Sequence, residues 1–404
     1  MSAGLLAGRR VLLGVCGGIA VYKVAGWVRE LVRDGAEVTV VMTAAAQRFV
    51  GPLTFAALSG RRVECAMFEA DSGRAIEHIR LAREAELVLV APATANSLAR
   101  FAHGLADDLL AAILLATRAP VLLCPSMNSD MFSHPATQDN LVRLAAWGYH
   151  QMTPASGALA CGEEGPGRLP DWEPVREQVV TLLSPQDLQG RTVLISAGPT
   201  REALDPARFL SNRSSGRMGY ALARTARRRG AAVRLVSGPT TLPDPPGVSV
   251  TRVTSGAEMA TEVLRQAAGV DVVAMAAAVA DFRPRQTATH KVKKGAAALT
   301  LSLERTQDIL GQLGVQPQPR PLLLGFAAES HDHLAEGRRK LREKKLDCIA
   351  VNDIGGQTTG FECETNQVTL IDAAGEYPLP LTSKEETAGR IWDHLAALLA
   401  RRQS

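Results

Sequence analysis

Short apolar runs alternate with amphipathic segments along the first half of the chain. The runs at 9–15, 37–43, 86–93 and 119–125 are strand-like, and 20–35 has the apolar spacing of a helix and ends at a glycine. Short, continuously apolar strands separated by helices are typical of a parallel sheet whose two faces are both covered. The first half of the chain is therefore predicted to be a doubly wound α/β domain.

The same alternation restarts after residue 190. Strand-like runs recur at 191–200, 231–240, 270–278, 321–329 and 346–353, and helical patterns recur at about 217–229, 256–267, 331–345 and 383–400. The polar, turn-rich stretch 184–190 suits a linker. We therefore predict an α/β protein with two Rossmann-like domains, each a mainly parallel sheet flanked by helices, at 1–183 and 191–404.

Composition adds limits on partners and compartment. A chain of 404 residues is longer than one core normally holds, which agrees with two domains. A net charge of +4 at this length gives no reason to expect a nucleic-acid or membrane partner. We expect no signal peptide and no membrane span, because no apolar run reaches the roughly 18 residues that spanning needs. The six cysteines include no CxxC pair, so neither a zinc site nor a disulfide framework is predicted and a reducing cytoplasm is favoured.

Glycines and polar side chains follow the predicted strands of the first half. GVCGGIAVYK (14–23) opens a helix after the first strand, where backbone N–H groups can approach a phosphate, although a plain tight turn explains it equally well. Thr94 and Asn96 follow the third strand, and Asn128 follows the fourth. One such residue would be an ordinary helix cap, but polar residues at two adjacent strand ends favour a binding site.

Two further side chains of the first half are candidates for chemistry. His78 lies alone among apolar and charged residues, and a lone histidine of this kind is more often structural than catalytic. Cys161 lies in the glycine-rich stretch SGALACGEEGPGRLPDW (156–172), whose composition suits a mobile loop and not a packed core. A thiol there suggests a lid that carries a reactive group, more than a buried structural cysteine.

The segments GGIAVYK, APATANSLA, PSMNSDMF and ACGEEGPGR, in this order, resemble the flavin-containing cysteine decarboxylases, and among them the phosphopantothenoylcysteine decarboxylases. The resemblance implies a Rossmann-like sheet that forms trimers, with FMN bound between subunits. It also implies that His78 is the active-site histidine, that Asn128 orients the substrate carboxylate, and that Cys161 belongs to a flap that clamps the substrate. The residues that would line FMN are Gly17, Gly18, Thr43, Thr94 and Asn96.

The implied chemistry would explain a thiol on a lid. Direct loss of CO₂ from a C-terminal cysteine leaves an unstabilised carbanion, whereas oxidation of the thiol-bearing carbon by FMN gives a thioaldehyde that accepts the electron pair. The resulting enethiolate must regain a hydride and a proton, and a thiol with a pKa of about 8.5 can deliver that proton. Cys16, Phe132 and Leu169 differ from the residues that are common in the family. These differences concern how the cofactor binds and how the flap clamps the substrate, and not His78, Asn128 or Cys161.

The strongest motif of the second half is SAGPTREALDPARFLSNRSSGRMGYALA (196–223). A strand leads into a long loop with arginines, Asn212, serines and a glycine before a helix, which favours a bound phosphate or carboxylate over a solvated basic loop. AAAVADFRP ends a further strand at Asp281. HKVKKG (290–295) has three lysines in four residues. Such a run is usually solvated surface, but facing a triphosphate it would neutralise developing charge.

These motifs resemble the phosphopantothenate–cysteine ligases, which in bacteria form the second half of bifunctional enzymes of coenzyme A biosynthesis. The resemblance implies that Lys291 is needed to form an acyl-nucleotide intermediate and that Asn212 acts on that intermediate. It implies CTP and Mg²⁺, although nothing in the residues separates CTP from ATP or gives the metal ligands. The segment TQDIL replaces the family's usual Asn-Pro-Asp-Ile. The implied nucleotide-binding residues are Met275, Ala276, Ala277, Asp281, Lys291, Gln307, Asp308, Ile309, Leu310, Phe326, Lys340 and Lys344.

The two resemblances together span almost the whole chain and imply small-molecule substrates. The ligase half would join 4'-phosphopantothenate to cysteine, and the flavin half would decarboxylate the product to 4'-phosphopantetheine. Family precedent implies trimers of the first domain and dimers of the second, which combine into a homo-dodecamer. One alternative is a non-catalytic inhibitory subunit of a phosphatase, which the presence of His78, Asn128 and Cys161 argues against. Another is a decarboxylase of peptide C-terminal cysteines, which only the ligase half argues against.

Overall fold

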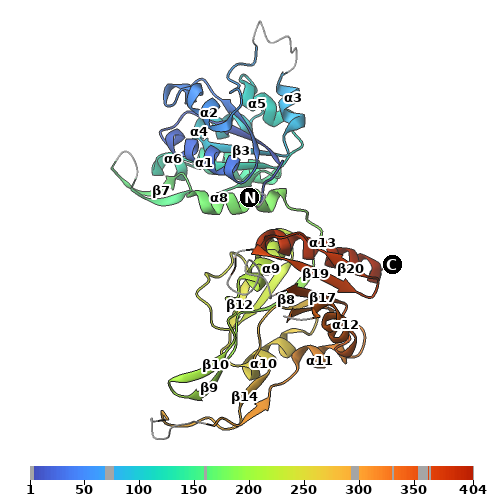
Figure 1. Ribbon diagram of the computed structural model, residues 1–404. Helices are drawn as coiled ribbons and strands as arrows, with labels where there is room; N and C mark the ends of the chain where they lie inside the picture. Colours follow the sequence, from blue (N-terminus) through green and yellow to red (C-terminus); the bar gives the residue numbers. More distant parts are fainter. Residues whose placement is uncertain are drawn as a thin grey trace. The chain divides into compact units, whose positions relative to one another are not determined.

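The computed structural model describes residues 4–68, 77–158, 162–292, 300–329, 332–353, 363 and 365–403. It divides into two compact units, one that ends at Ser184 and one that begins at Pro185 (Figure 1). Among the described helices, none combines the length and apolar character that crossing a bilayer requires.

The first unit is built on one parallel sheet with the strand order β2-β1-β3-β4-β5. Its strands are β1 (Arg10–Val15), β2 (Glu37–Met42), β3 (Leu87–Ala93), β4 (Val121–Pro125) and β5 (His150–Gln151). Its helices are α1 (Val21–Arg33), the 3₁₀ turn η1 (Ala46–Arg48), α2 (Pro52–Ser59), α3 (Glu77–Glu84), α4 (Ala95–Ala102), α5 (Leu109–Ala116), α6 (Ser129–Ser133), α7 (Pro135–Ala146) and α8 (Trp172–Leu183). Every residue of β3 is buried, as expected for a strand covered on both faces.

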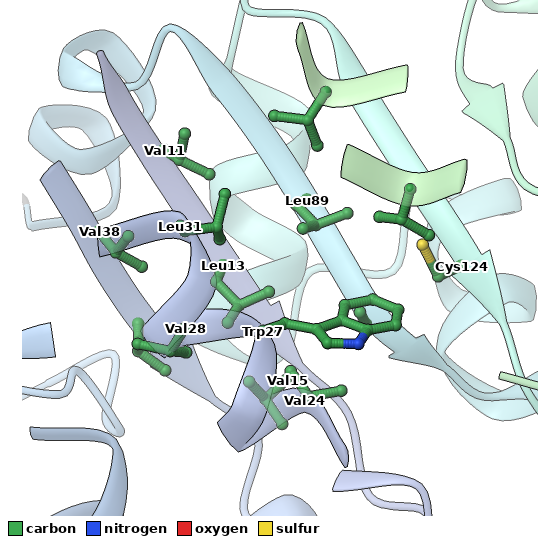
Figure 2. Packing of buried hydrophobic residues seen from close by; sticks show 14 of the residues in the cluster. Val11, Leu13, Val15, Val24, Trp27, Val28, Leu31, Val38, Leu89 and Cys124 are labelled. Atoms are coloured by element: carbon green, nitrogen blue, oxygen red, sulfur yellow. The ribbon is translucent and has the colours of Figure 1, made fainter. Parts of the chain in front are cut away.

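Successive residues of β1 supply two different cores. Val11, Leu13 and Val15 pack with α1, α2 and α8 on one face, whereas Leu12 packs with α3, α4, α5 and α7 on the other. Figure 2 shows the first of these cores, with Trp27 and Leu31 of α1 lying over the sheet. Truncating a fully buried leucine such as Leu31 to alanine should cost about 2–5 kcal/mol of unfolding free energy. Helices on both faces of a parallel sheet confirm the predicted α/β class.

The second unit has an eight-stranded sheet with the order β12-β11-β8-β13-β16-β17-β19-β20. Its strands are β8 (Thr192–Ala197), β11 (Ala232–Ser237), β12 (Ser249–Arg252), β13 (Val272–Met275), β16 (Leu322–Glu329), β17 (Cys348–Asp353), β19 (Val368–Asp372) and β20 (Glu376–Pro378). Its helices are α9 (Arg217–Arg228), α10 (Gly256–Gln266), α11 (Ile309–Gly314), α12 (His333–Glu343) and α13 (Lys384–Gln403). Only the last two strands of the order, β19 and β20, pair antiparallel, so this sheet is also mainly parallel.

Short strand pairs occupy two segments that were expected to be loops and others for which no strand was predicted. The long loop after β8 contains an antiparallel hairpin of β9 (Arg201–Asp205) and β10 (Arg208–Ser211). Two further pairs join β14 (Phe282–Pro284) to β15 (Leu303–Arg305) and β18 (Thr365–Asn366) to β21 (Thr382–Ser383). In the first unit, β6 (Ala155–Ala158) and β7 (Glu164–Arg168) form a hairpin within the glycine-rich stretch.

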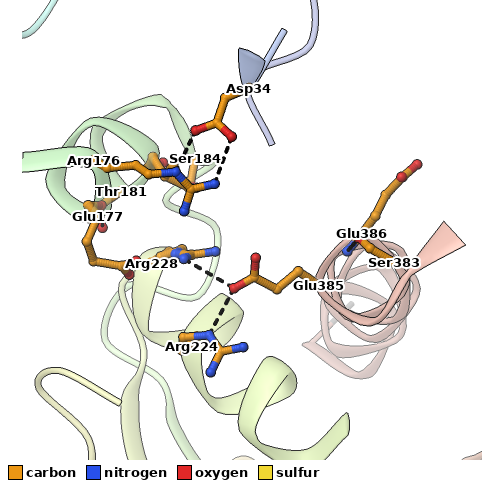
Figure 3. A network of polar contacts seen from close by, with 11 residues as sticks. Asp34, Arg176, Glu177, Thr181, Ser184, Arg224, Arg228, Ser383, Glu385 and Glu386 are labelled. Atoms are coloured by element: carbon orange, nitrogen blue, oxygen red, sulfur yellow. Dashed lines mark hydrogen bonds and ion pairs between the residues drawn. The ribbon is translucent and has the colours of Figure 1, made fainter. Parts of the chain in front are cut away.

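Ion pairs fix helices within each unit separately, and Figure 3 draws both sets. In the first unit, the Arg176 guanidinium of α8 donates to the Asp34 carboxylate at the end of α1, at 3.0 Å for one of the two bonds. In the second unit, the Glu385 carboxylate of α13 accepts from Arg224 of α9 at 2.9 Å and lies 3.4 Å from Arg228. Residues 185–190, from the stretch predicted as a linker, belong to this second unit, where Leu188 is fully buried.

Candidate active site

The first unit brings the predicted FMN residues to one edge of its sheet. The chain passes from β1 to β2 on one side and returns to β3 on the other, so the loops after β1 and β3 diverge at a topological switch point. A Cβ placed on Gly18 would lie 3.5 Å from Cγ2 of Thr94, which puts these two loops in contact. Ligands of open α/β sheets bind in such a crevice, at the carboxyl ends of the strands.

Backbone contacts hold the glycine loop and the neighbouring polar residues together. A Cβ on Gly17 would lie 2.4 Å from the Cβ of Ala45, so only glycine permits this approach to the segment after β2. Thr43, the first residue of that segment, accepts a hydrogen bond from the Ala46 N–H at 3.3 Å. Thr94 caps α4 by accepting from the Ser97 N–H at 3.3 Å, and the exposed Asn96 lies in the first turn of the same helix.

Cys16 lies in the same loop but is fully buried. Burial raises the pKa of its thiol to about 12, against an opposing hydrogen bond from Ser97. The thiol is therefore neutral at physiological pH, and it contributes packing, not a nucleophile.

Asn128 is held by bonds on both ends of its amide. Its Oδ1 accepts from the Asp130 N–H at 2.8 Å, which caps α6, and its Nδ2 donates to the Glu163 carboxylate at 2.8 Å. Glu163 belongs to the flap motif and lies just before β7, so this motif contacts the asparagine directly. A carboxylate is thus already seen as a partner of this amide. Cys161 itself lies outside the described residues.

The β6–β7 hairpin fits closely against the loop before α6. The Met127 N–H donates to the Gly167 carbonyl at 2.9 Å, and a Cβ on Gly167 would lie 2.2 Å from the Met127 carbonyl oxygen. Gly167 has φ at 130°, and a Cβ on Gly165 would lie 2.3 Å from Oγ of Ser129. Gly165 and Gly167 therefore allow the hairpin to pack closely against the loop that contains Asn128. This role differs from the chain flexibility that the sequence suggested.

His78 and Asn128 come from different helices, α3 and the cap of α6. It lies partly exposed in the first turn of α3, a helix that packs against α5 through Leu81 and Ala82. In Figure 1, α3 lies on the opposite side of the first unit from α6 and β7. The predicted flavin loops and Asn128 follow strands of the sheet, whereas His78 lies at the start of α3, the helix that precedes β3.

The second unit has a cavity of about 780 Å³ at the carboxyl ends of its parallel strands. The chain runs from β8 outward to β12 and then returns to β13 beside β8, so this unit also has a switch point beside its first strand. The volume suits a nucleotide-sized ligand. The predicted residues that line the cavity are Asn212, Met275, Ala276, Ala277, Asp281, Gln307, Asp308, Ile309, Leu310, Phe326, Lys340 and Lys344.

One wall of the cavity is the N-terminus of α9. Gly216 precedes this helix with φ at 78°, and a Cβ there would lie 3.3 Å from the backbone of Gly198 at the end of β8. A Cβ on Gly219 would lie 2.5 Å from the Cβ of Ala197, so the helix packs directly on the strand. The first N–H groups of α9, with the Ser214 and Ser215 segment, form a site suited to an anion.

Asn212 connects this wall to the loop after β13. Its Nδ2 donates to the Ala278 carbonyl at 3.0 Å, while the Ala278 N–H donates to the Gly198 carbonyl at 2.9 Å. The loop is further held by the Ala280 N–H, which donates to Oγ1 of Thr200 at 3.1 Å. Asn212 is exposed, so its amide lies on the cavity surface and not in the core.

Other lining residues supply an aromatic ring and lysines. Asp308 caps α11 through the Gly311 N–H at 3.0 Å and also accepts from Nζ of Lys344 at 2.9 Å. Gln307, at the position of the sequence departure, donates to Gln312 at 2.9 Å. Phe326 lines the same cavity from β16.

Lys291 is exposed and lies outside the cavity lining formed by the described residues. Its neighbour Val292 is tied to the β9–β10 hairpin: the Val292 N–H donates to Asp205 at 3.1 Å, and Arg208 donates to the Val292 carbonyl at 2.7 Å. Arg208 holds the pKa of the Asp205 carboxyl well below its usual range, helped by backbone N–H donors. The segment with Lys291 is therefore anchored on the hairpin.

Sequence reasoning missed several polar residues of the cavity. Asn352, Asn366 and Lys384 line it from the end of β17, from β18 and from the start of α13. Each comes from a segment whose motif carried no recognisable chemistry. They reach the cavity through the tertiary fold, in which β17 pairs with β16 and β19, and β18 pairs with β21.

Two family models together match almost the whole chain. The model described as Flavoprotein matches residues 2–184, and the model described as DNA/pantothenate metabolism flavoprotein C-terminal domain matches residues 188–399. The coenzyme A biosynthesis bifunctional protein CoaBC of Vibrio cholerae is 45% identical over 388 residues, which cover 96% of this chain and 97% of that protein. The chain belongs to the CoaBC family. The CoaBC protein of Bacillus subtilis is 44% identical over 399 residues, with 98% of each chain covered.

A crystal structure of the C-terminal domain of a CoaBC protein is 41% identical, covers 54% of this chain and 99% of that chain, and has a TM-score of 0.46. Membership of the CoaBC family confirms the expected bifunctional enzyme of coenzyme A biosynthesis, with a decarboxylase and a ligase activity. The first unit is a flavoprotein domain.

Proposed function

We propose that the ligase activity belongs to the second unit and the decarboxylase activity to the first. The ligase would condense 4'-phosphopantothenate with cysteine at the cost of CTP, and the decarboxylase would convert the product to 4'-phosphopantetheine with FMN. One observation carries the proposal: a single cavity of about 780 Å³ unites Asn212, Asp281, Phe326 and Lys340 from four distant segments. A nucleotide and a carboxylate substrate together need such a combination of anion site, aromatic wall and cations.

In the proposed ligase reaction, a carboxylate oxygen of phosphopantothenate attacks the α-phosphorus of CTP and pyrophosphate leaves. The cysteine amine then attacks the acyl carbon, CMP leaves with the acyl C–O electron pair, and the amine loses its proton to water. The α9 N-terminus binds phosphate oxygens, while Phe326 and Lys340 bind the nucleoside. Asn212, fixed on the Ala278 carbonyl, orients the activated acyl group.

The residues present fit Mg²⁺ bound together with the nucleotide. Asp281 offers a carboxylate on the cavity surface, and Mg²⁺ usually takes one or two carboxylates plus substrate phosphates. The described residues contain no cluster of three or more histidine, cysteine or acidic side chains for a preformed metal cage. When bound, the ion would neutralise phosphate charge.

In the proposed decarboxylase reaction, the glycine loop and the Thr94 edge would hold FMN, which supplies a two-electron acceptor when bound. The Asn128 amide binds the substrate carboxylate, as it binds that of Glu163 in the structure. Cys161 delivers a proton once the flap covers the site, and His78 orients the substrate.

The separation of site residues supports a homo-oligomer. His78 belongs to α3, which Figure 1 shows on the opposite side of the first unit from α6 and β7, and Lys291 lies outside the cavity lining formed by the described residues. A second copy can supply each missing group, which agrees with trimers through the first unit and dimers through the second, combined as a dodecamer. Size-exclusion chromatography with light scattering tests this, because a monomer that turns over would contradict it. We expect such a soluble enzyme in the cytoplasm.

The deciding experiment incubates the full chain with phosphopantothenate, cysteine, CTP and Mg²⁺ and detects phosphopantetheine by mass. Parallel reactions with ATP test the nucleotide, and reactions started from phosphopantothenoylcysteine test the decarboxylase alone. The purified protein should be yellow and show flavin absorbance. Absence of both activities from flavin-loaded protein would favour a non-catalytic binding role. Decarboxylation of peptides with C-terminal cysteine, without ligase activity, would favour the peptide enzyme.

A further inference from the structure

The loop between β13 and β14 combines a tightly held backbone with an unpaired acidic side chain. Ala278 and Ala280 each have both their N–H and their C=O group hydrogen-bonded to other segments. The Asp281 carboxylate, in contrast, is exposed and lines the cavity, and no hydrogen bond or ion pair joins it to another described residue. A fixed backbone that carries a free carboxylate into a cavity is typical of a group that is positioned for a ligand.

Thr200 holds this loop from one side. The parallel pairing of β8 with β13 continues beyond both strands as a bridge between Pro199 and Ala278, which brings Thr200 next to the loop. The Thr200 N–H donates to the Ala278 carbonyl at 3.3 Å, and Oγ1 of Thr200 accepts from the Ala280 N–H at 3.1 Å. Thr200 is itself fixed by Ser211, whose Oγ donates to the Thr200 carbonyl at 2.8 Å. One residue therefore holds two peptide groups of the loop.

The hydrogen bond between Thr200 and Ala280 is shielded from water. Thr200 is fully buried and Ala280 is 8% exposed. A Cβ on Gly256, the first residue of α10, would lie 3.3 Å from Cγ1 of Val279 and 3.9 Å from Oγ1 of Thr200, so this helix covers the bond. The Ala280 N–H therefore depends on the threonine hydroxyl, because a buried donor that loses its acceptor is not rescued by solvent.

Thr306 holds the same part of the loop from another side. It follows β15, whose last residue, Arg305, pairs with Phe282 at the start of β14. Oγ1 of Thr306 donates to the Ala280 carbonyl at 2.5 Å, and the Thr306 N–H donates to the Asp281 carbonyl at 3.0 Å. Two threonine hydroxyls thus bind the N–H and the C=O of one alanine, directly before Asp281.

Building on the proposed ligase function, we propose that Thr200 and Thr306 are positioning residues that hold the Asp281 carboxylate where it contacts the complex of CTP with Mg²⁺. Neither hydroxyl needs to touch the nucleotide, because Thr200 lies outside the cavity lining formed by the described residues and the Thr306 hydroxyl bonds to the loop. Hydrogen bonds on both sides of Ala280 restrict rotation of the adjoining peptide groups. The carboxylate is therefore placed before the nucleotide binds, which lowers the entropy cost of binding.

The alternative is that both hydroxyls only satisfy buried backbone groups and stabilise the fold. Their loss would then lower the free energy of unfolding but leave the affinity of the folded protein for CTP unchanged. The convergence of the two hydroxyls on the residue before Asp281 favours a positioning role. Variants that keep or remove each hydroxyl, with and without the Asp281 carboxylate, distinguish the two.

The test measures the affinity of the full chain for CTP with Mg²⁺ by isothermal titration calorimetry, and the KM for CTP by pyrophosphate release. Thr200→Val keeps the shape of the side chain but removes the acceptor of the Ala280 N–H, so it should weaken CTP binding by about tenfold. Thr200→Ser keeps the hydroxyl and should bind CTP within about threefold of wild type. Equal affinities of the folded Thr200→Val and Thr200→Ser variants would overturn the proposal.

A double substitution shows whether Thr200 acts through Asp281. Asp281→Asn should itself weaken CTP binding by about tenfold or more, because it removes a charged contact. In that background, Thr200→Val should cause less than about a twofold further loss, because the group that Thr200 positions is no longer there. The same loss from Thr200→Val with and without the Asp281 carboxylate would mean that Thr200 acts only on the fold, and the proposal would be wrong.

Thr306→Val and Thr306→Ser repeat the comparison at a half-buried position. Thr287→Val is the matched control, since Thr287 also donates its hydroxyl to a backbone carbonyl, that of Ala203 at 3.2 Å, but lies outside the cavity lining formed by the described residues. It should keep the wild-type affinity for CTP, and a loss as large as that of Thr200→Val would count against the proposal. If Thr200→Val does not fold, as judged by circular dichroism, the Thr306 pair decides: equal affinities of Thr306→Val and Thr306→Ser would overturn the proposal.

The outcomes separate this proposal from the function on which it rests. If wild type with Mg²⁺ binds no CTP and releases no pyrophosphate in the presence of phosphopantothenate and cysteine, the ligase assignment itself fails. If wild type is active but both Thr200→Val and Thr306→Val keep its affinity for CTP, only the positioning role is wrong.

Discussion

Asn212 and Lys291 should act at different steps of the ligase reaction, and their positions allow the difference to be tested. In Asn212→Asp, the side chain can no longer donate to the Ala278 carbonyl, a bond of 3.0 Å in the structure. The loss of one exposed hydrogen bond costs about 1 kcal/mol, roughly a fivefold effect. The loop itself should stay in place, because the Ala278 N–H still bonds to Gly198.

The larger effect should come from lost orientation of the acyl group. Removing a single preorganised contact to a reacting centre typically costs about a hundredfold to a thousandfold in rate. Asn212→Asp should therefore form the acyl-cytidylate but let it accumulate in the presence of cysteine. Lys291→Gln removes a cation needed for charge that develops during nucleotidyl transfer, so it should form no intermediate.

The assay quenches each variant with CTP, Mg²⁺ and phosphopantothenate, with and without cysteine, and separates the intermediate and pyrophosphate by chromatography. Lys345→Gln is the matched control for Lys291, since Lys345 is likewise exposed and lies outside the cavity lining formed by the described residues. Accumulation of the intermediate by Lys291→Gln, or its absence from Asn212→Asp, would refute the assigned roles.

Three substitutions test the first unit. Cys161→Ser should retain FMN and release CO₂, but it should lower phosphopantetheine output by about a hundredfold or more, because a hydroxyl is a far weaker acid than a thiol. Normal phosphopantetheine output, detected by mass, would remove Cys161 from the mechanism. His78→Asn should lower decarboxylation by about a hundredfold or more while pyrophosphate release stays normal, and loss of both would indicate a folding role instead. Glu163→Ala removes a carboxylate that competes with the substrate carboxylate for Asn128. The KM for phosphopantothenoylcysteine should therefore fall by up to about fivefold. A raised KM would show instead that Glu163 helps to bind the substrate.

The central strands could be predicted because they are buried on both faces and therefore read as continuous apolar runs. β3 is buried at every position, and the run predicted at 86–93 coincides with it to within one residue. Edge strands give no such signal. β12 has the sequence SVTR, with exposed or half-buried residues throughout, and it is defined only by its pairing with β11.

The glycine-rich stretch shows how one composition supports two physical interpretations. Glycine loses more conformational entropy than other residues when the chain becomes ordered, which led to the prediction of a mobile loop. Because it has no Cβ, glycine also permits two backbones to approach closely. The structure shows the second use at Gly167, which lies against the Met127 carbonyl and pairs within β7. Sequence alone could not distinguish these uses, because the contact partner lies some forty residues earlier in the chain.

Site residues could be predicted where they belong to a recognisable sequence motif. They could not be predicted where only the tertiary fold brings them to the site. Phe326 lies within a recognisable strand, Asp281 lies in the loop that follows another, and both line the cavity. Asn366 lies in a polar stretch without a motif, and it reaches the cavity because β18 pairs with β21. Lys291 belongs to a motif but is anchored on the β9–β10 hairpin, a placement that depends on the Asp205 carboxylate.

Both proposed reactions act on a carboxylate and both place an asparagine next to it, and the charge change explains why. In the ligase the carboxylate becomes a neutral acyl group, and in the decarboxylase it becomes CO₂, so negative charge leaves the carboxyl oxygens in each transition state. An arginine there would bind the ground state more strongly than the transition state and would slow the reaction. A neutral amide orients the carboxyl through directed hydrogen bonds at a smaller cost when the charge disappears. The Asn128 amide is fixed by the Asp130 N–H, which donates to its oxygen at 2.8 Å, and the Asn212 amide is fixed by its bond of 3.0 Å to the Ala278 carbonyl.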